Sequence, residues 1–248
     1  MSLTLATTSP GEPEIFASLQ GEGPSAGKPV AFIRLSRCNL ACQWCDTAYT
    51  WHFTGDNRPH RGDATFERTA NQVTLSEEDA ARAIAALGKP RLVITGGEPL
   101  LQGAALARML DALAELAPGM SVEVETNGTV APHPSFDAFV AQYTVSPKLT
   151  HSGNPADLAL PPERLRHWAG EPRAMFKFVI AEPADVDEVL ALAERFAIPA
   201  ARIWLMAEGT DPATLSAREA WLAETCLQHN LTLSKRLHIE LYGDTRGT

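Results

Sequence analysis

The sequence has few cysteines and no long apolar run. Its 248 residues include four cysteines, and three of these fall within eight positions, which is not the pattern of a disulfide framework. No segment approaches the roughly 20 apolar residues that cross a bilayer, and the first residues do not form a basic stretch followed by an apolar one. We therefore expect a cytoplasmic protein without a membrane partner, whose crowded cysteines stay reduced and are free to bind metal.

Basic residues are also scarce. The chain has 21 Lys and Arg against 30 Asp and Glu, which gives a formal net charge of −9. Because the basic residues are scattered, no stripe is available to neutralise a run of phosphates, and we expect a small-molecule substrate and no nucleic-acid partner. There is no internal repeat or low-complexity linker. The length fits one buried core, so we predict a single domain over residues 1–248, with an inserted loop at 46–75.

Short β-rich runs alternate with amphipathic helical patterns along most of the chain. Six runs rich in Val, Ile and Phe fit strands that are covered on both faces, at residues 30–36, 91–95, 121–125, 143–146, 175–180 and 202–206. Helical spacing follows at 76–87, 106–116 and 186–193, and from Asp211 onward. This order predicts an α/β fold with a mostly parallel sheet, in which right-handed crossovers place the carboxyl ends of the strands at one rim.

Two helix starts are marked by capping residues. Ser76, with Asp79 three positions later, forms a plausible capping box. Asp211 precedes Pro212, which suits the first position of a helix.

Three cysteines share the sequence CNLACQWC, directly after the first predicted strand. Three thiolates on one loop can hold three irons of a cubic cluster and leave the fourth iron open to a ligand. Zinc is the competing interpretation, with His52 as a fourth ligand, although zinc sites usually pair two separate hooks. The remaining cysteine, Cys226, follows Leu222 in a helical pattern, and we interpret it as a small buried apolar residue.

The spacing C-x3-C-x-aromatic-C, with Trp44 as the aromatic residue, resembles the signature of the radical SAM superfamily. The resemblance implies a 4Fe-4S cluster on Cys38, Cys42 and Cys45, and a partial (β/α)6 TIM-like barrel of the radical SAM type. It also implies that the open iron binds S-adenosylmethionine (SAM), whose reductive cleavage gives a 5′-deoxyadenosyl radical that abstracts hydrogen from the substrate.

Polar segments follow several of the other predicted strands. The segment 96–99, GGEP, is similar to a superfamily motif that contacts the SAM amino group, and its glycines allow close backbone approach. The resemblance implies SAM contacts at Trp44, Gly96, Gly97, Glu98, Glu125, Ser146, Pro147, Lys148, Met206, Ala207, Glu208 and Gly209. Taken singly, each segment is also compatible with an ordinary capped turn.

Over nearly the whole chain the sequence resembles the 7-carboxy-7-deazaguanine synthases. The segment 16–23, FASLQGEG, is similar to a family segment that holds a pterin, and 45–47, CDT, is similar to one that joins a magnesium site. The resemblance implies substrate contacts at Leu19, Gln20, Gly21, Glu22, Arg34, Thr95 and His238. It implies that Arg34 meets the substrate carboxylate and that the Thr47 hydroxyl binds Mg²⁺.

Other interpretations of these residues stay open at this stage. Without the family, 16–23 reads as a turn between two short strands, Thr47 as a threonine that bonds the loop backbone, and His238 as a structural histidine. We expect 236–244 to form the family's closing strand and tail, with His238 facing away from its apolar neighbours. The stretch 46–73 suits either a lid or a surface insertion.

The implied reaction converts 6-carboxy-5,6,7,8-tetrahydropterin to 7-carboxy-7-deazaguanine with loss of ammonia, on the route to queuosine. This is the work of a radical SAM carbon–nitrogen lyase, and it implies an electron donor such as flavodoxin or ferredoxin and a homodimer. A glycyl-radical enzyme activase of the same superfamily is the first alternative. A zinc-stabilised binding protein without catalysis is the second.

Overall fold

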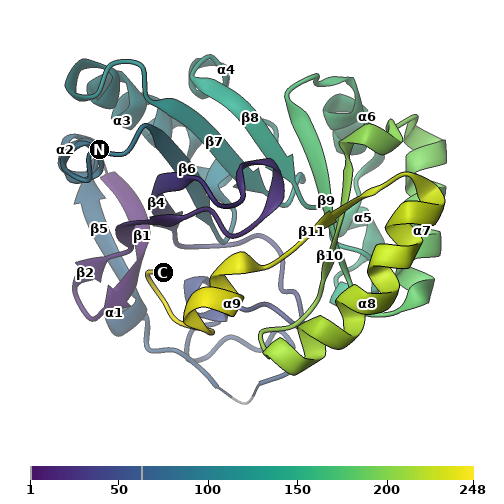
Figure 1. The fold of residues 1–248 in the computed structure, drawn as a ribbon. Coiled ribbons are helices and arrows are strands. Elements are labelled where there is room, and N and C mark those ends of the chain that lie inside the picture. The colour runs from purple at the N-terminus through teal and green to yellow at the C-terminus, as the bar shows by residue number, and fades with distance from the viewer. Residues whose placement is uncertain (1, 63) are drawn as a thin grey trace.

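The computed structural model describes residues 2–62 and 64–248, and within them the strands form one continuous mixed sheet (Figure 1). The sheet order is β11-β10-β9-β8-β7-β6-β4-β1-β2, with β3 paired to β4 and β5 paired to β1. The strands are β1 Ser2–Ser9, β2 Glu12–Pro13, β3 Ile15–Leu19, β4 Pro29–Leu35, β5 Gln72–Ser76, β6 Arg91–Gly96, β7 Ser121–Thr126, β8 Val140–Val145, β9 Ala174–Ile180, β10 Ile203–Ala207 and β11 Thr232–Ser234. The helices are α1 Arg68–Asn71, α2 Glu77–Ala86, α3 Gly103–Leu116, α4 Pro134–Asp137, α5 Ala156–Ala159, α6 Pro162–Gly170, α7 Pro183–Phe196, α8 Pro212–His229 and α9 Leu237–Tyr242.

The central part of the sheet is parallel. Strands β4, β6, β7, β8, β9, β10 and β11 pair with one another in parallel, and the long helices α2, α3, α7 and α8 cover the outer face of the curved sheet (Figure 1). The six predicted strands correspond to β4 and β6 to β10, so the predicted α/β fold with a mostly parallel sheet is confirmed. The short strand β11 extends this part, and its three residues are too few to give a periodic signal.

The amino-terminal strands close one side of the curved sheet. Strand β1 runs antiparallel to β5 over five residue pairs, and β3 forms an antiparallel hairpin with β4. Beyond β3, the Gln20 N–H donates to the Lys28 carbonyl at 2.9 Å, which starts the turn that carries the QGEG segment. The hairpin therefore holds this segment beside the inner face of the parallel strands.

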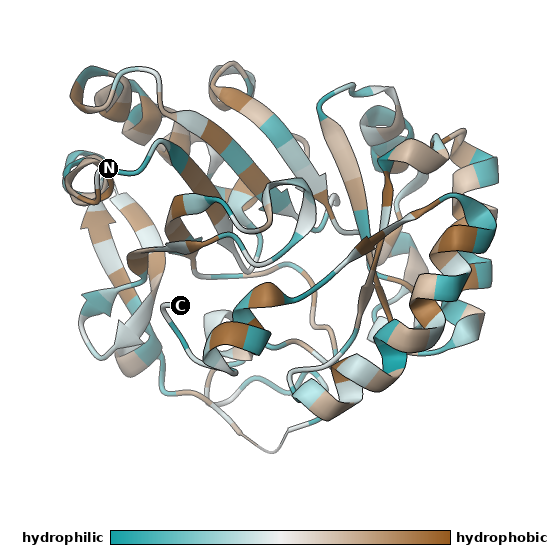
Figure 2. Cartoon of the chain, viewed as in Figure 1, coloured by the Kyte–Doolittle hydropathy of each residue, from teal (hydrophilic) through white to brown (hydrophobic). Residues whose placement is uncertain are grey.

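The helices pack on the sheet through the apolar faces that their spacing predicts (Figure 2). In α3 the side chains of Leu106, Met109, Leu110 and Leu113 are buried, and burial of one such side chain contributes about 1.5–3 kcal/mol. Both predicted caps are present. The Asp79 N–H donates to Ser76 Oγ at 3.0 Å, and the Thr214 N–H donates to Asp211 Oδ2 at 2.8 Å.

The prediction of a closing strand at 236–244 is wrong. This segment contains the helix α9, and the Leu237 N–H donates to the Gly21 carbonyl at 2.9 Å. Its alternating apolar residues fit a strand, but Arg236 is held by charged residues of other segments, and the chain turns there across the mouth of the curved sheet (Figure 1). Within α9, Ile239 is buried and Leu241 is half exposed.

The described residues of the predicted insertion, 46–62 and 64–75, have regular local structure of their own. A 3₁₀ turn covers Ala48–Thr50, Phe53 and Phe66 form an isolated bridge, and α1 leads into β5. The side chains of Trp51 and Phe53 are buried. Trp51 Nε1 donates to Cys45 Sγ at 3.4 Å and the Arg61 N–H donates to the Gln43 carbonyl at 2.8 Å, so these contacts hold the stretch against the cysteine loop. The division into one domain with an inserted loop stays a prediction.

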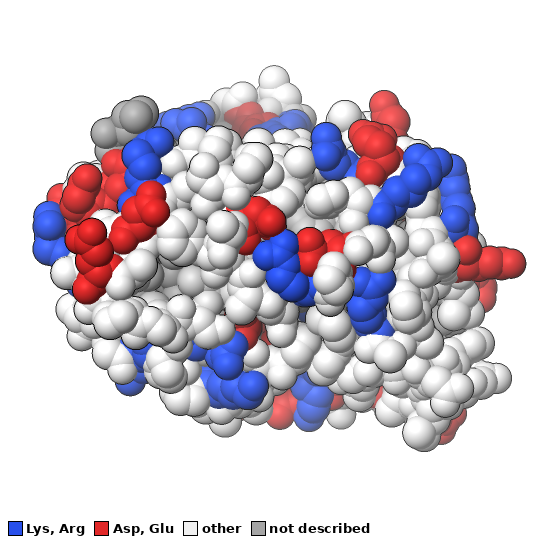
Figure 3. All heavy atoms as spheres, turned by 90° about the horizontal axis from the view of Figure 1, so that it is seen from above, with Lys and Arg blue, Asp and Glu red and all other residues white. Residues whose placement is uncertain are grey.

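Two further observations concern the length of the helices and the charges on the surface. None of the helices within residues 2–62 and 64–248 has the length and apolar character to cross a membrane. On the face seen in Figure 3, positive and negative side chains are interspersed among large uncharged areas. That face has no continuous basic field that would attract a polyanion.

Candidate active site

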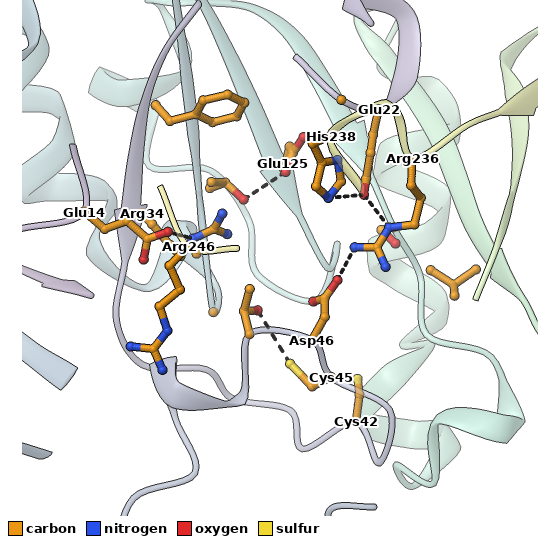
Figure 4. A pocket seen from close by; sticks show the side chains of 18 of the residues that line it. Glu14, Glu22, Arg34, Cys42, Cys45, Asp46, Glu125, Arg236, His238 and Arg246 are labelled. Atoms are coloured by element: carbon orange, nitrogen blue, oxygen red, sulfur yellow. Dashed lines mark hydrogen bonds and ion pairs between the residues drawn. The ribbon is translucent and has the colours of Figure 1, made fainter. Parts of the chain in front are cut away.

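A cavity of about 410 Å³ lies where the carboxyl ends of the parallel strands meet the cysteine loop. This volume is in the range of small-molecule sites. Its wall also includes the QGEG segment and residues of α9, so it joins segments from both ends of the chain (Figure 4). The cysteine sulfurs lie on one side of it, and an array of charged side chains lies on the other.

Two glycines allow the GGEP segment to press against the cysteine loop. Gly96 has φ +144°, and a Cβ there would collide with the backbone of Leu35. A Cβ on Gly97 would collide with the carbonyl of Arg37, while the Glu98 N–H donates to that same carbonyl at 2.9 Å. The two glycines thus allow the backbone of residues 96–98 to pack directly on the backbone of Leu35 and Arg37. This packing is separate from any contact with a ligand.

Each of the three predicted cluster cysteines has an N–H group directed at its sulfur. The Leu40 N–H donates to Cys38 Sγ at 3.5 Å, Asn154 Nδ2 donates to Cys42 Sγ at 3.3 Å, and Trp51 Nε1 donates to Cys45 Sγ at 3.4 Å. Donors to sulfur are a recurrent feature of iron–sulfur sites. Burial raises the pKa of Cys38 to about 12 and that of Cys45 to about 11, so a metal must displace the protons of these thiols.

The chemistry of this donor set, three thiolates close together in one loop, fits a cubic cluster with one thiolate on each of three irons. A cubic cluster gives each thiolate its own iron, whereas a zinc ion needs ligands that converge on one point. In the part of the chain that the structure describes, no three His, Cys, Asp or Glu side chains converge in this way. His52, the fourth ligand of the zinc interpretation, packs against Trp51 with ring centroids 5.1 Å apart. Cys226 is buried on α8, as predicted.

The GGEP carboxylate lies behind the cavity. Glu98 is fully buried and accepts hydrogen bonds from the Leu100 N–H at 3.0 Å, the Thr126 hydroxyl at 2.8 Å and the Asn127 N–H at 2.7 Å. Burial raises the pKa of Glu98 to about 7. The side chain therefore joins the ends of β6 and β7, and its contact with SAM stays a prediction.

The other predicted SAM residues, except Pro147, line one or both of two adjoining cavities. Trp44, Gly96, Gly97, Glu125, Ser146, Lys148 and Met206 line the first cavity. Ala207, Glu208 and Gly209 line a second cavity of about 320 Å³, which shares Trp44 and Met206 with the first. Among the described residues, Glu98 and Pro147 line neither. Trp44 is stacked on His151 at 5.3 Å between centroids, and its buried Nε1 has no partner within the described residues.

All seven predicted substrate residues line the first cavity: Leu19, Gln20, Gly21, Glu22, Arg34, Thr95 and His238. Arg34 Nε donates to Glu14 Oε1 at 2.7 Å, and the buried Glu14 also accepts from the Tyr49 hydroxyl at 2.9 Å. Glu125 accepts from Gln20 Nε2 at 3.1 Å and from the Thr95 hydroxyl at 2.9 Å. The polar wall is therefore preorganised by protein contacts.

Sequence reasoning missed a buried charged network beside this wall. Glu22 forms ion pairs with Lys177 and with Arg236, and Arg236 also pairs with Asp46, next to Cys45 (Figure 4). Burial alone would raise the pKa of Glu22, but the positive charges of Lys177 and Arg236 hold it well below its ordinary value. His238 Nε2 lies 3.9 Å from Glu22 Oε1. The His238 ring also occupies the space that a Cβ on Gly21 would need, so a larger residue at position 21 would displace the ring. A lone lysine in the apolar run AMFKFVI was the available signal.

Comparison with known proteins agrees with this geometry. Residues 32–140 match the family model of the Radical SAM superfamily. The 7-carboxy-7-deazaguanine synthase of Pyrobaculum aerophilum is 37% identical over 94% of this chain and 95% of that protein. The protein of the same name from Hyperthermus butylicus is 34% identical over 91% of this chain and 90% of its own length. The chain belongs to the 7-carboxy-7-deazaguanine synthase family.

A solved structure supports the same family. The crystal structure of QueE from Escherichia coli has a TM-score of 0.63 and 28% identity to this chain, and it covers 95% of both chains. The predicted family and the predicted radical SAM type of fold are thus confirmed. Membership of the 7-carboxy-7-deazaguanine synthase family favours the first hypothesis over the glycyl-radical activase and the zinc-stabilised binding protein.

The predicted magnesium residue, Thr47, lines the first cavity close to Cys45. Thr47 Oγ1 is 3.6 Å from Cys45 Sγ, and Thr47 lines the same cavity as Glu22 and Arg34. The Thr47 carbonyl accepts from the Thr50 hydroxyl at 2.8 Å, so the loop backbone is held by a different threonine. The hydroxyl of Thr47 contacts the Cys45 sulfur, and its contact with magnesium stays a prediction.

Proposed function

We propose that the protein converts 6-carboxy-5,6,7,8-tetrahydropterin to 7-carboxy-7-deazaguanine with loss of ammonia, as a step toward queuosine-type deazapurines. The observation that carries this proposal is one cavity that joins the three cysteines to a polar wall containing Arg34, Gln20 and Glu22. The names of the relatives specify the product, and the wall suits a flat ligand with many donors and one carboxylate.

In this proposal Cys38, Cys42 and Cys45 hold the 4Fe-4S cluster, and residues around Trp44 and Gly97 bind SAM. When bound, the cluster and SAM supply a 5′-deoxyadenosyl radical. The protein keeps this chemistry away from water, since most of the aromatic side chains around the cysteine loop are buried, among them Trp51 and Tyr49.

Arg34 binds the substrate carboxylate in this scheme. The charge of Glu14 offsets the effect of burial and raises the pKa of Arg34, so the guanidinium stays charged. Glu14 engages Nε, which fixes the plane of the group and leaves its terminal nitrogens for a carboxylate. Glu22 and Glu125 accept from the amino and ring N–H groups of the pterin.

Magnesium completes the site in this proposal. A hydroxyl is a weak ligand for Mg²⁺, so the oxygen of Thr47 acts together with substrate oxygens and water. Arg34 would hold the carboxylate beside Thr47, so that the hydrogen on the adjacent carbon would face the SAM side of the cavity. Such positioning contributes several kcal/mol, on the order of what well-oriented intramolecular reactions gain.

The finer parts of the proposal concern partners and place. We propose a homodimer in the cytoplasm, reduced by a flavodoxin or a ferredoxin. Sedimentation of the reconstituted protein tests whether it is a homodimer. Turnover with reduced flavodoxin or reduced ferredoxin in place of dithionite tests the electron donor.

The test of the reaction is an anaerobic assay of the reconstituted protein with the pterin, SAM and dithionite. We expect 7-carboxy-7-deazaguanine and ammonia in equal amounts. With deuterium on the carbon that bears the carboxylate, the label moves to 5′-deoxyadenosine. Cleavage of SAM without the deazaguanine would reject the substrate. Arg34→Lys keeps the charge but loses the planar fork, and we expect it to raise KM by at least about tenfold.

A further inference from the structure

Four side chains outside the cysteine loop lie within hydrogen-bond distance of its sulfurs. Asn127 Nδ2 is 3.9 Å from Cys38 Sγ and Thr47 Oγ1 is 3.6 Å from Cys45 Sγ, and two nitrogen donors, on Trp51 and Asn154, lie closer. Trp51 Nε1 is 3.4 Å from Cys45 Sγ, and Asn154 Nδ2 is 3.3 Å from Cys42 Sγ. They come from different parts of the chain, since Trp51 follows the turn Ala48–Thr50 and Asn154 follows the turn Thr150–Ser152.

The orientation of the Trp51 indole is fixed by its surroundings. The residue is 3% exposed, the guanidinium of Arg58 lies 4.7 Å from the ring centroid, and the rings of His52 and His60 meet it edge-on at 5.1 and 6.1 Å. His60 Nε2 is in turn 2.9 Å from the Cys45 carbonyl. With water excluded, the N–H has the sulfur as its acceptor.

The orientation of the Asn154 amide is fixed by its oxygen. The Ala41 N–H donates to Asn154 Oδ1 at 2.8 Å, so the oxygen must face Ala41. The amide nitrogen consequently faces Cys42, where it is a donor. The reverse orientation would bring two N–H groups together, which decides the assignment of the two amide atoms.

We infer that Trp51 and Asn154 raise the reduction potential of the cluster by donating hydrogen bonds to Cys45 and Cys42. Reduction by one electron adds negative charge to the cluster and its thiolates, and N–H groups directed at sulfur stabilise the more negative state. Asp46, next to Cys45, acts in the opposite direction, and its pairing with Arg236 limits that effect. The inference rests on the iron–sulfur part of the proposed function.

The experiment is a potentiometric titration of the reconstituted full chain, followed by electron paramagnetic resonance, without SAM or pterin. Trp51→Phe keeps the ring and removes the donor. We expect the equilibrium constant for reduction to fall about tenfold, which moves the midpoint about 59 mV more negative. Asn154→Asp keeps the acceptor for Ala41, removes the donor to Cys42 and adds a negative charge. Both changes disfavour reduction, so its midpoint should move in the same direction and further than that of Trp51→Phe.

Trp204→Phe is the matched control. Trp204 lies on β10, and its buried Nε1 has no partner within the described residues, so this variant loses an indole without losing a bond to a cysteine. Its midpoint should equal that of the unaltered protein.

Two outcomes would overturn the inference. The first is a midpoint of Trp51→Phe or Asn154→Asp equal to that of Trp204→Phe. The second is loss of iron from both variants while Trp204→Phe keeps four irons per chain, because the side chains would then be needed to build the cluster. Failure to form the deazaguanine leaves the titration unaffected, so the two proposals fail separately.

Discussion

Arg236 lies at the centre of the buried charged network, and its replacement gives a sharp test of what this network contributes. The Arg236 side chain is 7% exposed and its Nε donates to Glu22 Oε1 at 3.0 Å. It also pairs with Asp46 and donates to the Gly209 carbonyl at 2.5 Å. Arg236→Met keeps much of the volume and removes every one of these contacts.

The expected loss of stability follows from which charges stay paired. Removal of one partner from a buried ion pair costs about 3–5 kcal/mol. Here Glu22 keeps Lys177, and the Asp46 side chain is 35% exposed, so solvent screens it. We therefore expect the low end, about 3 kcal/mol, which for a chain of this size lowers the melting temperature by roughly 6–12 °C.

Urea unfolding of the metal-free chain measures this loss, and a double-mutant cycle with Glu22→Gln assigns it. Without the Glu22 charge, Arg236→Met leaves fewer unpaired groups, so the double variant should be more stable than the sum of the single losses by about 2 kcal/mol. Additivity within about 0.5 kcal/mol would refute the reasoning. The exposed pair Arg82–Asp79 supplies the control, since Arg82→Met should not change the unfolding midpoint.

The pH dependence of the Arg236 effect has a defined sign. In the folded chain the pKa of Glu22 is held well below its ordinary value of 4.5, chiefly by Lys177 and Arg236 acting against burial. The stability that this supplies is present above about pH 4.5 and is lost as the pH falls further. The difference between the unaltered chain and Arg236→Met should therefore shrink below that pH.

Three further changes test other parts of the site. Burial raises the pKa of Glu98 from 4.5 to about 7. As the pH rises through that window, the free energy of unfolding of the unaltered chain should therefore fall by up to about 3 kcal/mol relative to that of Glu98→Gln. Equal urea midpoints for the two proteins at pH 5 and pH 8 would contradict this. Gly96→Ala should lower the stability by at least about 2 kcal/mol and reduce iron binding, because its Cβ meets the Leu35 backbone. The control Gly88→Ala should cost only about 1 kcal/mol of stability in thermal unfolding, because its Cβ would stand in open space. Iron analysis should find four irons per chain in Cys226→Ala and almost none in Cys42→Ala; loss of iron from Cys226→Ala would make the buried thiol a ligand.

The sequence was informative wherever local pattern decides structure. The Val- and Ile-rich runs predicted six of the parallel strands, because strands buried on both faces are continuously apolar. The caps at Ser76 and Asp211 also depend only on neighbouring residues. The seven predicted substrate residues, which line one cavity, were named from the family resemblance.

The sequence was uninformative where distant segments decide structure. The ion pair of Glu22 with Arg236 joins residues 214 positions apart, and its pair with Lys177 joins residues 155 apart. No local pattern contains such pairings. The helix α9 was mistaken for a strand for the same reason, since its direction depends on Arg236 and on the bond from Leu237 to Gly21.

The bond between Leu237 and Gly21 also sets the order in which the protein can be completed on the ribosome. The N–H groups that donate to the three cysteine sulfurs, on Leu40, Trp51, Asn127 and Asn154, have all been synthesised once Asn154 emerges, so a metal-binding loop can form early. The wall around Gly21 must wait for about 80 further residues, until α9 leaves the exit tunnel. A nascent chain can thus acquire iron well before it can enclose a pterin.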